Sequence, residues 1–305
     1  MKEASDRKSN TLFSGLLQEI TTIYLFIRSD LLAVFVPGAL TLLASWIVSG
    51  ASLNVLPLYF LNSLIFSFLF LYTVCLSNQL ISIEEDRKNK PWRPLPSNLV
   101  TIQGTYSRLV FANILLLLLA YQLNIFYFAV LWQLVTFFTD RMRWHIYLGA
   151  KNLVFMTLGV FALFCSQWQI IQPLDASIYQ YAIILSIWSG LAFHIQDMRD
   201  QAGDRLIGRK TLPLAIGDGN ARIALALFFL IFSPLIILLL FTTNIPIERL
   251  IGDSILNVLF ILILLFNWFI AYRILKFRTA SGDHKSYTSF LYLFCLLMFL
   301  IGVIR

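Results

Sequence analysis

Charged residues are scarce in this chain. Only 13% of its 305 residues are Asp, Glu, Lys or Arg, whereas 59% are hydrophobic, and the mean hydropathy is +0.78. Soluble domains carry about 25% charged and about 45–50% apolar residues. A soluble core of this length could not bury so much apolar surface, which excludes an ordinary soluble fold. The composition therefore predicts a protein whose solvent is the lipid bilayer.

Cysteine is also rare. Cys75, Cys165 and Cys295 each lie in an apolar run, without the CxxC or Cys/His spacing of a metal site. This pattern argues against a disulfide framework and against structural zinc. We expect three small, buried hydrophobic side chains.

The N-terminus has no compact apolar core followed by a small-residue cleavage site, which argues against a signal peptide. We interpret residues 1–25 as a cytoplasmic or interfacial segment. Residues 26–305 are predicted to form a single polytopic helical membrane domain.

What the chain does have is long apolar runs, and a spanning helix needs about 20 mostly apolar residues. The candidate spans are residues 31–49, 57–83, 105–121, 124–140, 147–168, 177–197, 221–243, 254–275 and 286–304. These runs are continuously apolar rather than alternating, which favours helices over barrel strands. We therefore predict an all-α integral membrane protein with about nine transmembrane helices around a central cavity.

Basic residues are concentrated in every second connection between these spans, and the intervening connections have almost none. By the positive-inside rule, the N-terminus and the ends of the second and sixth spans should be cytoplasmic. The net charge of +7 is then a topology signal. No nucleic-acid partner is expected, and the sequence does not indicate an oligomeric state.

Acidic and polar residues gather at two span ends. The first cluster comprises Asn78, Ser82, Glu85 and Asp86, and the second comprises Asp197, Asp200 and Asp204. At about 100° per residue, the Asn78, Ser82 and Asp86 positions fall within about 80° of one another, and the three aspartates of the second cluster within about 60°. Each helix end should therefore present an oxygen-rich stripe.

Stacked carboxylates repel one another, so something must compensate their charge. Neighbouring Arg and Lys residues could neutralise them in a salt-bridge network. Alternatively, Mg²⁺ could bind, because it takes a few carboxylates and keeps other positions for water and phosphate. Arg93, Arg205 and Lys210 would then clamp a diphosphate. An acidic stripe beside a basic loop, occurring twice, favours the metal–diphosphate interpretation.

At these residues the chain resembles the UbiA-type intramembrane prenyltransferase superfamily, whose motifs are NDxxDxxxD followed by RPLPSG, and DxxxD or DxxDxxxD followed by GxxTLP. The matching positions are Asn78, Asp86, residues 93–97, Asp197, Asp200, Asp204, Gly208 and residues 211–213. Tyr147 and Lys151 resemble the tyrosine and lysine of that family that face the diphosphate. The resemblance implies Mg²⁺ as cofactor and an isoprenyl diphosphate, of farnesyl or similar length, as substrate.

Two departures from the first motif bear on the chemistry. Gln79 and Ser82 stand where the family pattern has aspartates. Their loss could weaken metal binding, with Glu85 compensating, or it could mark a branch with changed chemistry. Segments 28–31, 84–97 and 196–213 resemble the terpene-cyclase branch of the family, which favours ionisation followed by intramolecular cyclisation. The alternative is transfer of the prenyl group to an aromatic or other lipophilic acceptor.

The cavity that holds the carbocation should offer aromatic faces and a proton acceptor. Trp188 and Phe193 are candidates for the aromatic lining, and His194 is a candidate acceptor, although a lone histidine here is more often a hydrogen-bonded helix–helix residue. An ion transporter is a third interpretation, but it predicts charged groups near mid-span and broken helices. In this sequence the acids lie at span ends beside basic loops.

Overall fold

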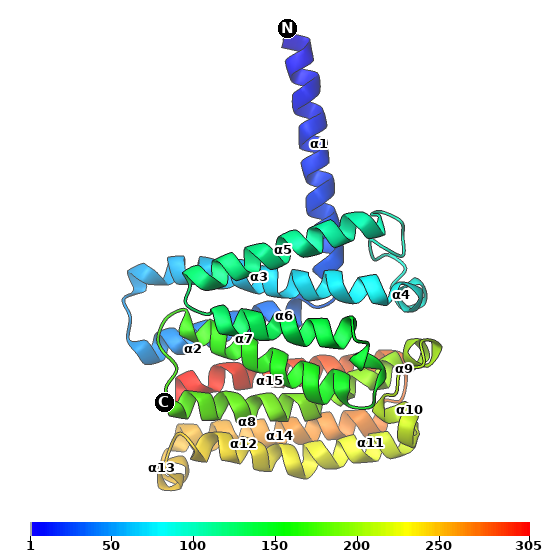
Figure 1. Cartoon of the computed structure of the whole chain (residues 1–305). Helices are drawn as coiled ribbons and strands as arrows, with labels where there is room; N and C mark the ends of the chain where they lie inside the picture. Colours follow the sequence, from blue (N-terminus) through cyan, green and yellow to red (C-terminus); the bar gives the residue numbers. More distant parts are fainter. Residues whose placement is uncertain (1) are drawn as a thin grey trace.

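The computed structural model describes the backbone of residues 2–305 and the side chains of residues 15–305 apart from Asn89 and His145. The described chain is helical and contains no strand. Its long helices run side by side in one bundle, with their short connections at the two ends (Figure 1). Eight helical stretches of the described residues are long and apolar enough to cross a membrane.

Every span predicted from the sequence is present as a helix. The spanning helices are α2 (Leu31–Ser49), α3 (Leu56–Ile81), α5 (Ile102–Gln122), α7 (Thr157–Gln169) with the π-helical turn Ala150–Met156 before it, α8 (Ala176–Ala192), α11 (Asp218–Leu227) and α12 (Ser233–Thr242) joined by the π-helical turn Phe228–Phe232, α14 (Ser254–Lys276) and α15 (Ala280–Ile304). The fourth predicted span is α6 (Phe126–Asp140), which is apolar but has only 15 residues. The prediction of about nine helices is confirmed.

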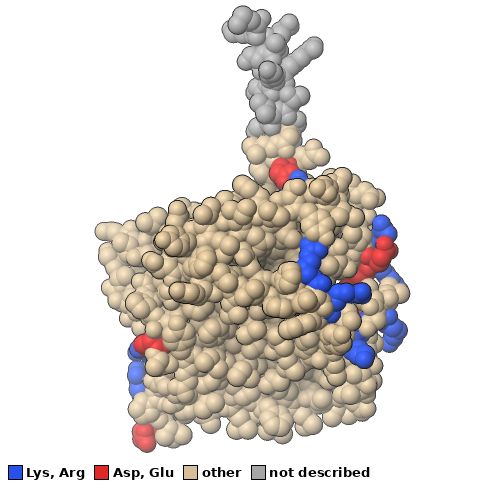
Figure 2. All heavy atoms as spheres, viewed as in Figure 1, with Lys and Arg blue, Asp and Glu red and all other residues tan. Residues whose placement is uncertain are grey.

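The shorter helices lie at the bundle ends. They are α4 (Ile83–Asn89), α9 (Asp197–Leu206), α10 (Leu212–Ile216) and α13 (Ile247–Gly252), together with the short turns Leu53–Val55, Trp144–Ile146 and Phe193–Gln196. Figure 2 shows charged side chains at both ends of the visible face and a broad uncharged band between them. This distribution is that of a multi-pass membrane protein, whose apolar band matches the lipid.

Local sequence fixes where the spans begin. Four span N-termini are capped by Thr101, Asp175, Asp253 and Thr279, whose side-chain oxygens accept backbone N–H groups of the first helical turn. These bonds satisfy donors that a helix leaves open at its start.

Close approach and buried hydrogen bonds hold the spans together, as expected where lipid provides no hydrophobic drive between helices. A Cβ added to Gly302 of α15 would lie 2.7 Å from the Cα of Ala44 on α2, so only glycine permits this contact. Between α3 and α7, Ser63 Oγ donates to Gln167 Oε1 over 2.5 Å, and Gln167 Nε2 donates to Ser67 Oγ over 2.9 Å.

The N-terminal segment belongs to α1 (Lys2–Ile27), and from residue 15 onward its side chains are described. Near its end, Phe26 packs edge-on against Tyr72 of α3, and Glu19 accepts hydrogen bonds from Arg108 of α5 at 2.6 and 2.8 Å. The assignment of residues 1–25 as an interfacial segment stays a prediction. The three cysteines are free and buried, as predicted.

Candidate active site

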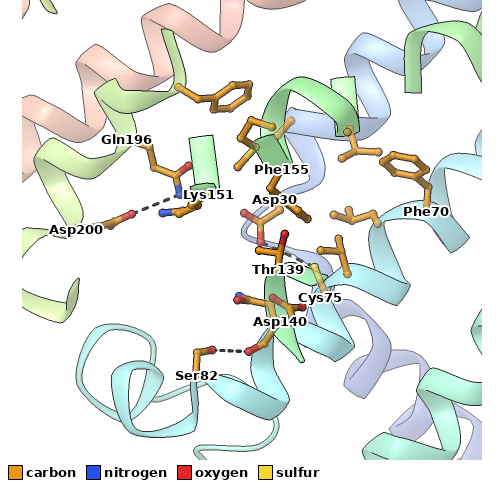
Figure 3. A pocket seen from close by; sticks show the side chains of 18 of the residues that line it. Asp30, Phe70, Cys75, Ser82, Thr139, Asp140, Lys151, Phe155, Gln196 and Asp200 are labelled. Carbon is orange, nitrogen blue, oxygen red and sulfur yellow. Dashed lines mark hydrogen bonds between the residues drawn. The ribbon is translucent and has the colours of Figure 1, made fainter. Parts of the chain in front are cut away.

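A pocket opens between α2, α3, α6 and α7, beside α4 and α9 (Figure 3). Its polar end is lined by Asp30, Asn78, Ser82, Glu85, Asp86, Lys90, Arg93, Asp140, Lys151, Asp200 and Arg209. Its apolar interior is lined by Phe70, Leu71, Val74, Trp132, Phe155, Met156, Val160 and Leu163. On each helix the polar residues stand about one turn or more from the apolar ones, which separates a charged end from an apolar depth.

The first predicted cluster lies at the polar end. The second predicted span is interrupted at Ser82, where α3 ends and α4 begins. The oxygen-rich stripe survives the interruption, because Asn78, Ser82, Glu85 and Asp86 all line the pocket. Ser82 Oγ donates to Asp86 Oδ2 over 3.1 Å.

Arg93 neutralises this cluster. Its Nη1 lies 2.8 and 2.9 Å from the two oxygens of Asp86, and its Nη2 lies 3.5 Å from Asp30. Burial lowers the pKa of Arg93, but the carboxylates of Asp86 and Asp30 outweigh burial and raise it above the ordinary value. Arg93 therefore stays charged at the polar end of the pocket, where an anionic ligand would meet it.

The second predicted cluster begins where the sixth span changes from α8 through a tight turn into α9. Asp197 is fully buried there, and Lys151 Nζ lies 3.5 Å from its Oδ1. Asn152 Nδ2 lies 2.7 Å from the other oxygen of Asp197 and 2.9 Å from Nδ1 of His194. Asp200, three residues further on, reaches the pocket and lies 3.3 Å from Arg199.

Arg209 joins the two clusters. Its Nη1 lies 2.7 Å from Asp204 on α9, and its Nη2 lies 3.4 Å from Glu85 on α4. Gly208 adopts φ +68°, a left-handed conformation that glycine takes readily, and the Arg209 N–H then bonds back to the Asp204 carbonyl at 3.0 Å. This turn directs the guanidinium between the clusters.

The structure thus contains salt bridges in which Arg and Lys side chains neutralise the two acidic clusters, which is one of the two alternatives that the sequence left open. Among the described residues, no three His, Cys, Asp or Glu side chains form a ready-made metal cage. Buried oxygens without a hydrogen-bond partner nevertheless remain, namely those of Asn152, Gln196 and Asp204. Carboxylate and amide oxygens are the donors that Mg²⁺ prefers, and Mg²⁺ takes its remaining ligands from water and phosphate. The donor set fits that ion chemically.

The other predicted site residues divide into those at the pocket and those outside it. Lys151 and Phe193 line the pocket. Tyr147 is 59% exposed and lies outside the pocket lining, and Arg205 and Lys210 line a second hollow beside α10. Trp188 is fully buried and donates from Nε1 to Ser233 Oγ over 2.7 Å, so it packs between helices away from the cavity.

Several residues at the pocket or directly behind it were missed by sequence reasoning. Asp140 ends the fourth span, which is the same signal that marked the two clusters, but a single acid forms no stripe. Asn152 has no motif around it. Arg209 stands between the predicted Arg205 and Lys210, and only the turn at Gly208 shows which of the three points inward.

Gln79 clarifies one departure from the family pattern. Its side chain is fully buried outside the pocket lining, and its Nε2 donates to the Phe26 carbonyl of α1 over 3.1 Å. The side chain at this position therefore ties α1 to α3, whereas Ser82 remains at the site.

Comparison with known proteins defines the class. The model of the UbiA prenyltransferase family matches residues 38–298. The chain therefore belongs to the UbiA prenyltransferase family. The proteins similar to this chain include a diterpene cyclase and a polyprenyl transferase.

Three curated relatives are similar over most of the chain. The diterpene cyclase eriG of Hericium erinaceus is 29% identical and covers 94% of this chain and 90% of its own length. The somaliensene A/B synthase of Streptomyces somaliensis is 31% identical, with 72% of this chain and 73% of its own covered. The polyprenyl transferase eriF of Hericium erinaceus is 27% identical, with 95% and 96% covered.

The fold has a solved counterpart in a UbiA homologue from Archaeoglobus fulgidus bound to DMAPP and Mg²⁺. It superposes with a TM-score of 0.68 at 16% identity, covering 93% of this chain and all of that one. At this identity the likeness shows the fold alone.

Proposed function

We propose that this protein ionises an isoprenyl diphosphate inside the membrane, with the aid of Mg²⁺, and then cyclises the resulting carbocation to a terpene. The observation that carries the proposal is the two-part pocket, whose polar end contains four cationic side chains and whose depth is apolar and aromatic. An isoprenyl diphosphate has the matching two parts, a polyanionic head and a hydrocarbon tail.

The polar end provides the charge that a departing diphosphate needs. Arg93, Lys151 and Arg209 face the pocket from three different segments, and Lys90 is a fourth cation. Donors fixed before reaction stabilise the leaving group more than mobile water does. Arg93 and Arg209 offer planar forks, and Lys151 offers a point charge.

Of the predicted residues, those that line the pocket and are suited to hold Mg²⁺ are Asn78, Ser82, Glu85 and Asp86 on one side and Asp200 on the other. When bound, the ion would act as a Lewis acid on the diphosphate oxygens. Asp200 and Glu85 line the pocket directly, whereas Asp197 and Asp204 lie behind Lys151 and Arg209 and orient them.

The apolar depth suits a carbocation. Trp132 stacks on Phe70 with ring centroids 4.1 Å apart, and Phe155 lies 5.0 Å from Trp132. Aromatic faces attract cations, and a dry lining keeps water from capturing them early. Trp132 is held in place because its Nε1 donates to the Phe70 carbonyl over 2.9 Å.

Cyclisation is favoured over transfer to an acceptor by the relatives, of which eriG and the somaliensene synthase bear cyclase or terpene synthase names. Intermolecular transfer is the alternative, and eriF bears a polyprenyl transferase name at similar coverage. The basic connections between spans favour a cytoplasmic position for the polar end of the pocket.

The test measures diphosphate release by purified protein in lipid nanodiscs, with geranyl, farnesyl or geranylgeranyl diphosphate. We expect release with Mg²⁺ and none after the divalent ions are chelated. Asp86→Ala and Asp200→Ala should abolish release. Full activity in either variant would show that the site lies elsewhere, and no release by the wild type with any of these substrates would refute the proposal.

Glu84→Ala is the matched control. Glu84 lies on the same helix as Glu85 and Asp86, but its partner is Arg87 at 2.6 Å on the exposed surface. Removing it changes the charge of α4 without touching the pocket. We expect wild-type release from this variant.

A further inference from the structure

Five carboxylates line the pocket, and four of them are paired with a guanidinium. Asp86 and Asp30 lie 2.8 and 3.5 Å from Arg93. Glu85 lies 3.4 Å from Arg209, and Asp200 lies 3.3 Å from Arg199. Asp140 is the fifth, and it forms no salt bridge with any described residue.

Asp140 is nevertheless buried. The residue is 3% exposed at the C-terminal end of α6, and its Oδ2 has no hydrogen-bond partner among the described residues. Ser77 of α3 hydrogen-bonds the same carboxylate. Arg141, next in the chain, and Arg209, which also lines the pocket, act on it electrostatically, but neither forms a salt bridge with it. Figure 3 shows Asp140 at the polar end, beside Ser82.

This placement is unfavourable for stability. A buried carboxylate without a cation is costly. The negative end of the helix dipole adds to the cost at a helix C-terminus. A structural role therefore does not account for an aspartate here, because an uncharged residue of the same shape would be stabler.

A base that removes a proton from a reaction intermediate needs a free lone pair facing the reaction. The paired carboxylates are held in their charged form by Arg93, Arg199 or Arg209, which makes them weaker bases. His194, the acceptor predicted from the sequence, is absent from the pocket lining, and its Nδ1 lies against Asn152 and Asp197. Asp140 lines the pocket, and its Oδ2 has no hydrogen-bond partner among the described residues.

We propose that Asp140 accepts the proton whose loss ends cyclisation, an inference that rests on the proposed cyclase function. The C–H bond next to the cationic carbon breaks, its electron pair forms the new C=C bond, and the proton moves to Asp140 Oδ2. The electron pair of the earlier C–O cleavage leaves with the diphosphate. The electron pair of the broken C–H bond neutralises the carbocation, so no oxidant or reductant is needed. The proton returns to water through the polar end.

The test compares Asp140→Asn with the wild type using two separate measurements in nanodiscs, diphosphate release and the hydrocarbon product profile. Asn keeps the size of the side chain but loses the base. We expect release to stay within about threefold, and the wild-type cyclic alkene to fall by about tenfold or more. Isomeric alkenes or alcohols should replace it, and the alcohols should carry the heavy isotope when the reaction runs in oxygen-18-labelled water.

Asp140→Glu, which restores a carboxylate, should recover part of the wild-type alkene. Asp140→Asn should also unfold at no lower denaturant concentration than the wild type, since it removes an unpaired buried charge. An unchanged product profile would overturn the proposal, as would loss of release like that of Asp86→Ala or a failure of Asp140→Asn to fold. Failure of the proposed function is distinct, because the wild type itself would then release no diphosphate or would require an acceptor.

Discussion

Replacing Arg93 by methionine tests the electrostatics of the polar end. The side chain is 4% exposed and forms ion pairs with two carboxylates, Asp86 at 2.8 Å and Asp30 at 3.5 Å. Methionine fills a similar volume without charge, so both carboxylates lose their cation. Breaking a buried ion pair by removing one partner costs about 3–5 kcal/mol. We expect Arg93→Met to lower the free energy of unfolding by that amount and to abolish diphosphate release.

The matched control is Arg87→Met on the neighbouring helix. The Arg87–Glu84 distance of 2.6 Å is shorter than that of Arg93–Asp86, but these side chains are 53% and 77% exposed. Exposed pairs contribute at most about 1 kcal/mol, because water screens them. Burial, not distance, should therefore decide the outcome.

The assay is denaturant unfolding of both variants in mixed micelles, followed by tryptophan fluorescence. A double-mutant cycle with Asp86→Asn isolates the pair, since removing both charges should cost less than the sum of the single changes. Equal and small losses for Arg93→Met and Arg87→Met would refute the reasoning.

Two further predictions concern packing around the site. A Cβ at Gly159 would lie 2.6 Å from Cζ3 of Trp132, so Gly159→Ala should press the indole into the pocket. We expect this variant to lose about 1–3 kcal/mol of unfolding free energy. In competition assays it should prefer shorter prenyl diphosphates than the wild type does. An unchanged preference would contradict this. Gln79→Asp restores the family motif but buries a carboxylate and loses the bond to Phe26, so we expect a less stable protein with no gain in Mg²⁺-dependent activity; a gain would show that position 79 reaches the metal.

Much of the fold follows from local sequence. Apolar length predicts the spans, and the end of the fourth span at residue 140 agrees with α6. The length of an apolar run does not predict a short break or change of helix type near the end of a span. The breaks at Ser82 and at residues 193–196 therefore escaped prediction, because each interrupts the hydrogen-bond ladder for only a few residues.

The site was predictable to the level of residue clusters. Helical spacing brought Asn78, Ser82 and Asp86 to one face, and the structure lines one pocket with all three. Spacing cannot tell which acid will be covered by a cation from elsewhere in the chain. Asp204 is turned toward Arg209 and away from the pocket lining for that reason.

Tertiary contacts decide the remaining roles. Trp188 was a candidate for the cavity because it precedes the second motif, but its Nε1 finds Ser233 on another span. Trp132, with no motif near it, is the indole that lines the pocket, because glycine at position 159 lets α7 approach it. Neither Ser233 as the partner of Trp188 nor Gly159 as the neighbour of Trp132 could be identified from the pattern of residues along the sequence.

The most direct test of the central claim is the fate of the prenyl group when no acceptor is present. Purified protein in nanodiscs is incubated with Mg²⁺ and farnesyl or geranylgeranyl diphosphate alone, and the extracted products are analysed by gas chromatography with mass spectrometry. We predict cyclic hydrocarbons in amounts matching the diphosphate released. Product formation only after an aromatic or quinone precursor is added would contradict cyclisation and assign the pocket to prenyl transfer.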